Sequence, residues 1–96
     1  MYTIENIKQK LSPVFRGYNV SYALLFGSYA KGVATEKSDI DLYVDSGLKG
    51  MKFVGLIEAI RDALGDREVD VLDVAHVDND SGVFKEIQRT GVKIYG

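Results

Sequence analysis

Two short apolar runs separated by a Gly-Ser break constrain the fold most strongly. The first run covers Val20 to Phe26, Gly27-Ser28 follows at once, and the second run covers residues 39–44. Runs of this length are typical of strands, and apolar residues on both faces of the first run indicate a buried, central strand. A glycine at a strand end lets the backbone turn sharply. We therefore expect two strands of one sheet, joined by this turn, a short helix from Ser28 and a polar loop over residues 32–37.

The second expected strand carries two carboxylates. Because side chains alternate along a strand, Asp39, Asp41 and Tyr43 project to one face and the apolar residues between them to the other. Two neighbouring carboxylates repel each other and lose solvation. A divalent cation offsets both costs, since Mg²⁺ prefers carboxylate oxygens and keeps positions open for water and phosphate. The pair therefore predicts a magnesium site.

The Gly-Ser turn can supply the other half of a nucleotide site. If Ser28 to Lys31 forms the first turn of a helix, its free N–H groups face an incoming anion. The Ser28 hydroxyl adds a hydrogen bond and Lys31 adds a charge. Taken singly, a Gly-Ser turn, an Asp-x-Asp pair and a lysine are more often ordinary structure. Their combination, with only residues 29–38 between the halves, predicts phosphate binding by Gly27, Ser28 and Lys31.

Two segments carry a family resemblance. Residues 27–32 (GSYAKG) and 38–44 (SDIDLYV) closely resemble the nucleotidyltransferase signature of the DNA-polymerase-β-like superfamily, and more narrowly the minimal nucleotidyltransferase (MNT) family. Lys31 stands where arginine is more usual, which keeps the charge but loses the bidentate fork. The resemblance spans essentially the whole chain. It implies an α+β nucleotidyltransferase fold. The order of the expected helices and strands supports a small mixed sheet with helices packed mainly on one face, and the length of 96 residues suggests a single domain, residues 1–96.

A third carboxylate is expected on the strand over residues 68–74. Alternation along this strand places Asp70 and Asp73 on opposite faces, so only one of them can face the site. The resemblance matches Asp70 to the third catalytic carboxylate. Asp73 is expected on the surface of an edge strand, and His76, the single histidine, is expected to be solvated or structural.

The remaining elements follow from apolar periodicity. A first helix, capped by Thr3, is either kinked by Pro13 or restarted there with Ser12 as the cap, and Gly17 is expected to end it in a left-handed conformation. A second helix covers residues 51–64. Gly55 inside it costs about 1 kcal/mol relative to alanine, which predicts a close neighbour. A last helix from Val83 ends near Thr90, and residues 92–95 either complete the sheet or dock a partner. The strand order stays open.

Composition limits the partners. The net charge is −2, with a pI of about 5.3, so no overall basic field attracts an extended nucleic acid. Without cysteine, the chain has neither disulfides nor thiolate metal sites. No apolar run approaches the roughly 20 residues needed to span a bilayer, and residues 1–6 lack the features of a signal peptide. We expect a soluble, cytoplasmic protein without a membrane partner.

The expected activity is that of a Mg²⁺-dependent nucleotidyltransferase. Asp39 and Asp41 would hold two Mg²⁺ ions, while Asp70 would bind the ion nearer the acceptor and could take the acceptor proton. Gly27-Ser28 and Lys31 would hold the β- and γ-phosphates, so that attack falls on the α-phosphate. ATP is the expected donor, although no residue shows how other bases would be rejected.

The acceptor is expected to come from a partner. The expected elements use nearly all 96 residues, which leaves no acceptor domain, so another protein or a second copy would complete the site. The resemblance implies a small helical HEPN protein, commonly a ribonuclease toxin, because MNT antitoxins attach AMP to a tyrosine of that partner. Two alternatives stay open: an antitoxin that only binds, and a small-molecule nucleotidyltransferase of the aminoglycoside-modifying kind. The intact site motifs argue against the first, and the missing acceptor domain argues against the second.

Overall fold

The chain alternates between helices and strands along most of its length. A computed structural model describes residues 2–65 and 67–96. The elements in chain order are α1 (Ile4–Gly17), β1 (Tyr22–Phe26), α2 (Ser28–Lys31), β2 (Ile40–Asp45), α3 (Met51–Leu64), β3 (Val69–Asp73), the 3₁₀ turn η1 (Val74–His76), α4 (Gly82–Thr90) and β4 (Val92–Tyr95).

The four strands form one mixed sheet in the order β3-β2-β1-β4. β1 runs antiparallel to both of its neighbours, whereas β2 and β3 run parallel. A parallel pair needs a long crossover connection, which α3 supplies. β4 pairs with β1 and buries Ile94, so the C-terminal residues complete the sheet. The mixed sheet is confirmed, and the strand order that the sequence left open is now defined.

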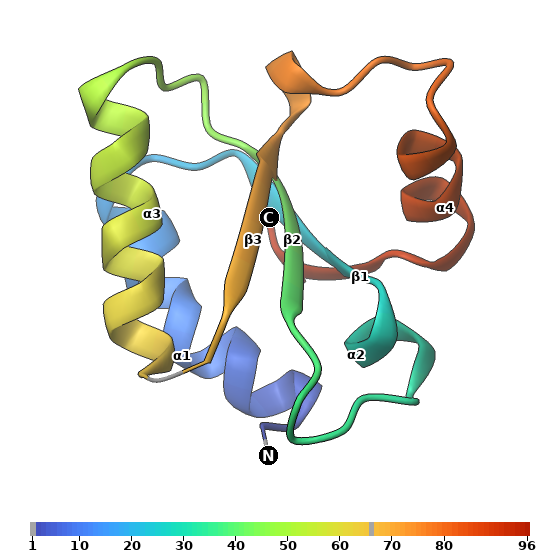
Figure 1. Ribbon diagram of the computed structural model, residues 1–96. Coiled ribbons are helices and arrows are strands. Elements are labelled where there is room, and N and C mark those ends of the chain that lie inside the picture. The colour runs from blue at the N-terminus through green and yellow to red at the C-terminus, as the bar shows by residue number, and fades with distance from the viewer. Residues whose placement is uncertain (1, 66) are drawn as a thin grey trace.

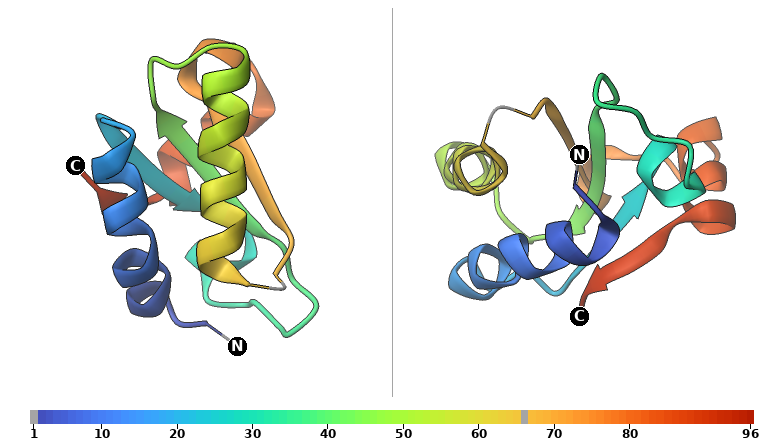
Figure 2. Two further views of the ribbon diagram at one scale, coloured as in Figure 1. Left: turned by 90° about the vertical axis from the view of Figure 1, so that its left-hand side faces the viewer. Right: turned by 90° about the horizontal axis from the view of Figure 1, so that it is seen from below.

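Most helical cover lies on one face of the sheet (Figure 1). The two long helices, α1 and α3, pack side by side there, as both views in Figure 2 show. The main core joins their apolar stripes to alternate residues of β2. Its fully buried members from these three elements are Ile7, Leu11, Phe15, Leu56, Ile60, Leu64, Ile40, Leu42 and Val44.

The second face of the sheet is partly covered by the shorter helix α4. Phe26, Tyr43 and Ile87 are buried together in a smaller cluster on this side. Tyr43 therefore faces away from Ile40 and Leu42, as the alternation predicted. The expected fold, with helices mainly on one face, is confirmed. α2 and α4 lie together on this side of the sheet (Figure 1).

The first helix differs from its prediction at its C-terminal end. Thr3 caps it as expected, since its hydroxyl accepts a hydrogen bond from the Asn6 N–H at 3.0 Å. Pro13 lies inside one continuous helix, and the predicted restart at Ser12 is wrong. Gly17 remains helical, and Asn19 instead takes the left-handed conformation (φ 57°), which asparagine tolerates better than most residues.

The second long helix has the predicted bounds, 51–64. A Cβ placed on Gly55 would lie 3.3 Å from the Tyr18 hydroxyl, so the close neighbour expected at this glycine is confirmed. In the ranges that the structure describes, none of the helices is both long and apolar enough to cross a membrane.

Candidate nucleotide site

Two aspartates meet across the parallel strand pair. Asp41 is the second residue of β2, Asp70 is the second residue of β3, and the two are direct partners in the ladder. Residues paired in this way project to the same face of the sheet. Asp39 precedes the strand, because β2 begins only at Ile40, and its predicted place within the strand is therefore wrong. Its side chain is exposed. We call the start of β2 and β3, where these aspartates lie, the acidic end of the sheet.

The pKa of Asp41 is shifted by burial and by neighbouring carboxylates. Its pKa is raised from 3.8 to about 6, first by burial and then by the charges of Asp70, Asp39 and Glu86. Each of these effects disfavours the ionised form. The charges that act on Asp41 thus come from the two other carboxylates predicted from the sequence and from Glu86, which sequence reasoning missed. We refer to Asp39, Asp41, Asp70 and Glu86 as the acidic cluster. Glu86 sits in an ordinary amphipathic helix, and no local pattern marks it.

The turn after β1 is fitted tightly to Asp41. Phe26, the last residue of β1, pairs with Asp41, and Gly27 follows with φ 72°. A Cβ at Gly27 would collide with the Asp41 carboxylate. Glycine is favoured here by its backbone conformation, and any larger residue would displace the Asp41 carboxylate. Ser28 begins α2 directly after it, so the predicted phosphate-binding turn and the acidic pair adjoin each other.

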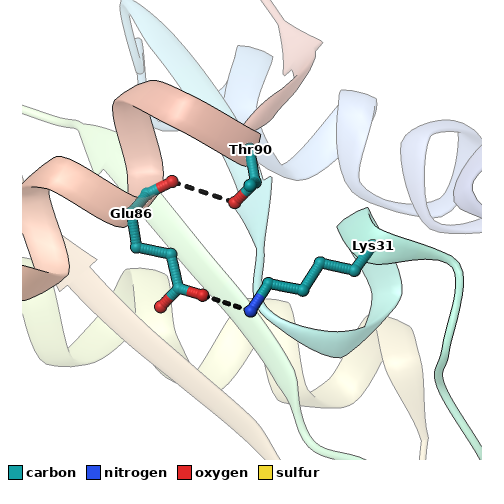
Figure 3. A network of polar contacts seen from close by, with 3 residues as sticks. All are labelled: Lys31, Glu86 and Thr90. Carbon is teal, nitrogen blue, oxygen red and sulfur yellow. Dashed lines mark hydrogen bonds and ion pairs between the residues drawn. The ribbon is translucent and has the colours of Figure 1, made fainter.

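Lys31, the predicted phosphate-binding cation, is engaged by α4. Its ammonium forms an ion pair with the carboxylate of Glu86 (Figure 3). Hydrogen bonding to Lys31, together with its charge, lowers the pKa of Glu86. Glu86 also contributes to the raised pKa of Asp41, which places the Lys31 ammonium at the edge of the acidic cluster.

The donor set fits a hard divalent cation in charge and ligand type. Asp39, Asp41 and Asp70 offer carboxylate oxygens, and a cation would relieve the repulsion that raises the pKa of Asp41. Within residues 2–65 and 67–96, no three His, Cys, Asp or Glu side chains are already set as a metal-binding group. The carboxylates are gathered by the backbone, and their side chains would still have to converge on an ion.

Asp73 has a structural role. It is 2% exposed, so its expected surface position is wrong. Its carboxylate accepts hydrogen bonds from the Ser46 N–H (3.0 Å), the Ser46 hydroxyl (2.6 Å) and the Ala75 N–H (3.0 Å). Burial alone would raise its pKa, but these hydrogen bonds outweigh burial and lower it. As the alternation of side chains predicted, Asp73 and Asp70 project to opposite faces of the sheet.

A pocket lies beside the end of β3 and the segment that follows it. Leu72 lies two residues after Asp70 and therefore on the same face of the strand. The pocket has a volume of about 350 Å³. It is lined by Leu72, His76, Val77, Asp78, Ser81 and Val83. His76 also contacts the Phe53 ring edge-on, with 5.4 Å between ring centroids.

Comparison with known proteins identifies the family of this chain. Residues 9–96 match the family described as "Polymerase beta, Nucleotidyltransferase". A Methanocaldococcus jannaschii protein that bears the name protein adenylyltransferase is 39% identical over 72 residues, which cover 72% of this chain and 75% of that protein.

Solved structures share the fold. A toxin–antitoxin crystal structure with AMP-PNP superposes with a TM-score of 0.77 at 25% identity, covering 93% of this chain and 73% of the other. The complex of a tri-AMPylated Shewanella oneidensis HEPN toxin with an MNT antitoxin superposes at 0.72, with 21% identity over 98% of this chain and 73% of the other. The family match includes every residue of the acidic cluster and of the Gly-Ser turn. The chain therefore belongs to the polymerase-β nucleotidyltransferase family.

Proposed function

We propose that this protein is a Mg²⁺-dependent adenylyltransferase that transfers AMP from ATP to a tyrosine hydroxyl of a HEPN toxin and so acts as its antitoxin. The observation that carries the proposal is the register of Asp41 with Asp70, beside a glycine turn that leaves no room for a Cβ. A relative named protein adenylyltransferase supports the reaction. Neighbours solved with AMP-PNP and with an AMPylated HEPN toxin support the donor and the acceptor.

The donor side of the site is assigned to the Gly-Ser turn. Gly27 exposes backbone without a side chain, and Ser28 offers a hydroxyl and an N–H group at the start of α2. Lys31 supplies a positive charge one turn further on. These groups would hold the β- and γ-phosphates, which leaves the α-phosphate beside Asp41 and Asp70. Positioning and charge neutralisation are the main sources of catalysis in phosphoryl transfer.

Mg²⁺, when bound by Asp39, Asp41 and Asp70, would neutralise phosphate charge and lower the pKa of the attacking hydroxyl. The acceptor oxygen forms a bond to the α-phosphorus, the bond to the bridging oxygen breaks, and pyrophosphate leaves. Asp70 is exposed at this end of β3 and would take the acceptor proton. The pocket beyond Leu72 gives the acceptor segment a surface on the same side.

A transfer assay tests the proposal. The protein is incubated with α-labelled ATP and Mg²⁺, with and without the HEPN protein encoded beside it, and products are mapped by mass spectrometry. We expect AMP on a tyrosine of the partner, lost in Asp41→Asn and retained in the control Asp62→Asn, which alters an exposed residue of α3. Neutralisation of the toxin without transfer of label would instead identify a binding antitoxin. Label on a free small molecule would identify an enzyme of the drug-modifying kind.

A further inference from the structure

We propose that Glu86 is a positioning residue that competes with the nucleotide phosphates for Lys31. In the free protein the Glu86 carboxylate forms an ion pair with the Lys31 ammonium. A bound triphosphate has to displace this carboxylate in order to contact Lys31. The inference rests on the proposed function only for the identity of the ligand as a nucleoside triphosphate. It goes further by assigning a role to a residue of α4, outside the Gly-Ser turn and the aspartate motif.

The geometry places this ion pair beside the Gly-Ser turn and the acidic cluster. Lys31 ends α2, the element that begins at the Gly-Ser turn, and Glu86 reaches it from the middle of α4 (Figure 3). The two side chains remain 43% and 33% exposed, so an incoming anion can reach the ammonium. The Thr90 hydroxyl donates to the Glu86 backbone carbonyl at 2.9 Å, a bond within α4 that does not involve the carboxylate.

The charge balance gives the sign of the effect. Glu86 lies close enough to Asp41 to add to the repulsion within the acidic cluster. Phosphate would therefore meet a fourth carboxylate and a lysine that is already paired. Arg89, which also lowers the pKa of Glu86, is the other positive group acting on this carboxylate. Removing the Glu86 charge frees Lys31 and weakens the repulsion, so both effects favour phosphate binding.

A purely structural ion pair would behave differently. Exposed ion pairs contribute little to stability. If Glu86 only joined α4 to α2, its loss would leave nucleotide affinity unchanged or lower it through a looser site. A gain in nucleotide affinity therefore distinguishes competition for Lys31 from a purely structural role of Glu86. Glu86→Gln keeps the length and helix propensity of the side chain while removing its charge.

The test is calorimetric titration with Mg²⁺ and AMP-PNP. We expect Glu86→Gln to bind roughly three- to tenfold more tightly than the wild type, and Lys31→Gln to bind more weakly. In the double variant most of the gain should disappear, because the competition acts through Lys31. Glu86→Asp, whose shorter side chain reaches Lys31 less well, should show a smaller gain. The matched control is Glu58→Gln, which breaks the exposed Glu58–Arg61 pair (3.8 Å) of α3 and should change nothing.

The failures of the two proposals are distinguishable. If the wild type binds the probe but Glu86→Gln binds equally or more weakly, the competition is refuted and the proposed function stands. If the gain persists undiminished in the Lys31→Gln background, Glu86 does not act through Lys31, and the positioning role is refuted. If neither the wild type nor Glu86→Gln binds, both proposals are refuted.

Discussion

The parallel pair β2–β3 carries aspartates of two opposite kinds. Near the start of the pair, Asp41 and Asp70 face each other as like charges, and the pKa of Asp41 is raised to about 6. Near its end, Asp73 is buried on the other face and accepts three hydrogen bonds, and its pKa is lowered.

This contrast separates a structural carboxylate from a candidate functional one. Asp73 is satisfied by groups of its own chain, so its charge is stabilised in the folded protein. Asp41 is partly buried and lies near other carboxylates, and within the described residues every cause that acts on its pKa raises it. An arrangement that destabilises the free protein is expected where a ligand supplies the missing partner. The comparison therefore predicts opposite consequences for substitutions at the two ends.

The largest expected effect is on transfer at the start of the pair. Asp70→Asn should reduce AMP transfer by about 10²-fold or more, because it removes the group assigned to the acceptor proton and to the cation. Much of the nucleotide affinity should remain, since the phosphates are held from the β1 side. Initial rates and calorimetric titration of the same variant measure the two quantities.

Asp73→Asn is the control for this experiment. Assayed below its melting temperature, it should keep the specific activity of the wild type. If Asp73→Asn lost transfer and Asp70→Asn kept it, the assignment of the two strand faces would be reversed.

The free energy of unfolding should change most when Asp73, near the end of the β2–β3 pair, is substituted. Asp73→Asn should lower the free energy of unfolding by about 2–3 kcal/mol, because the amide cannot accept from both Ser46 and Ala75. Since the folded pKa of Asp73 lies below its ordinary value, its contribution is present above about pH 4 and is lost as pH falls through the folded pKa. Urea unfolding at several pH values measures both. Equal stability of variant and wild type at pH 7 would contradict the structural role.

A substitution at Asp41 is expected to change the free energy of unfolding in the opposite direction. Asp41→Asn should raise the free energy of unfolding at pH 7 by about 1–2 kcal/mol, after discounting for solvent screening, because it removes an uncompensated charge. The folded pKa exceeds the unfolded one, so the wild type loses this stability as pH rises from about 4 to 6, and the gain of the variant should vanish near pH 4. Thermal melts without Mg²⁺ test this. A variant less stable than the wild type at pH 7 would show that the Asp41 charge is already compensated.

How far the sequence predicts the molecule depends on the range of the interactions. Apolar periodicity gave the bounds of α3 and the two faces of β2, because both follow from local spacing. The register that pairs Asp41 with Asp70 could not be predicted, since it depends on the crossover through α3. Asp73 accepts hydrogen bonds from Ser46, which lies 27 residues away along the chain. Lys31 pairs with Glu86, which lies 55 residues away. Such contacts leave no local pattern.

The smallest expected effect concerns one of the hydrogen bonds that Asp73 accepts. Ser46→Ala removes the hydroxyl that donates to Asp73 at 2.6 Å but keeps the backbone N–H. We expect a loss of about 1 kcal/mol and an upward change in the pKa of Asp73, because burial is then less well offset. Urea unfolding gives the first quantity and NMR titration the second. An unchanged pKa would show that the backbone bonds alone hold the charge.

The central claim is that the carboxylates at the start of β2–β3 form the cation and nucleotide site, while the carboxylate at the end does not. Calorimetric titration of Mg²⁺ and ATP into the wild type, Asp41→Asn and Asp73→Asn tests it most directly. We predict that Asp41→Asn remains folded but loses at least about tenfold in affinity, equivalent to about 1.4 kcal/mol, while Asp73→Asn binds like the wild type. Unchanged affinity in a folded Asp41→Asn protein would contradict the assignment.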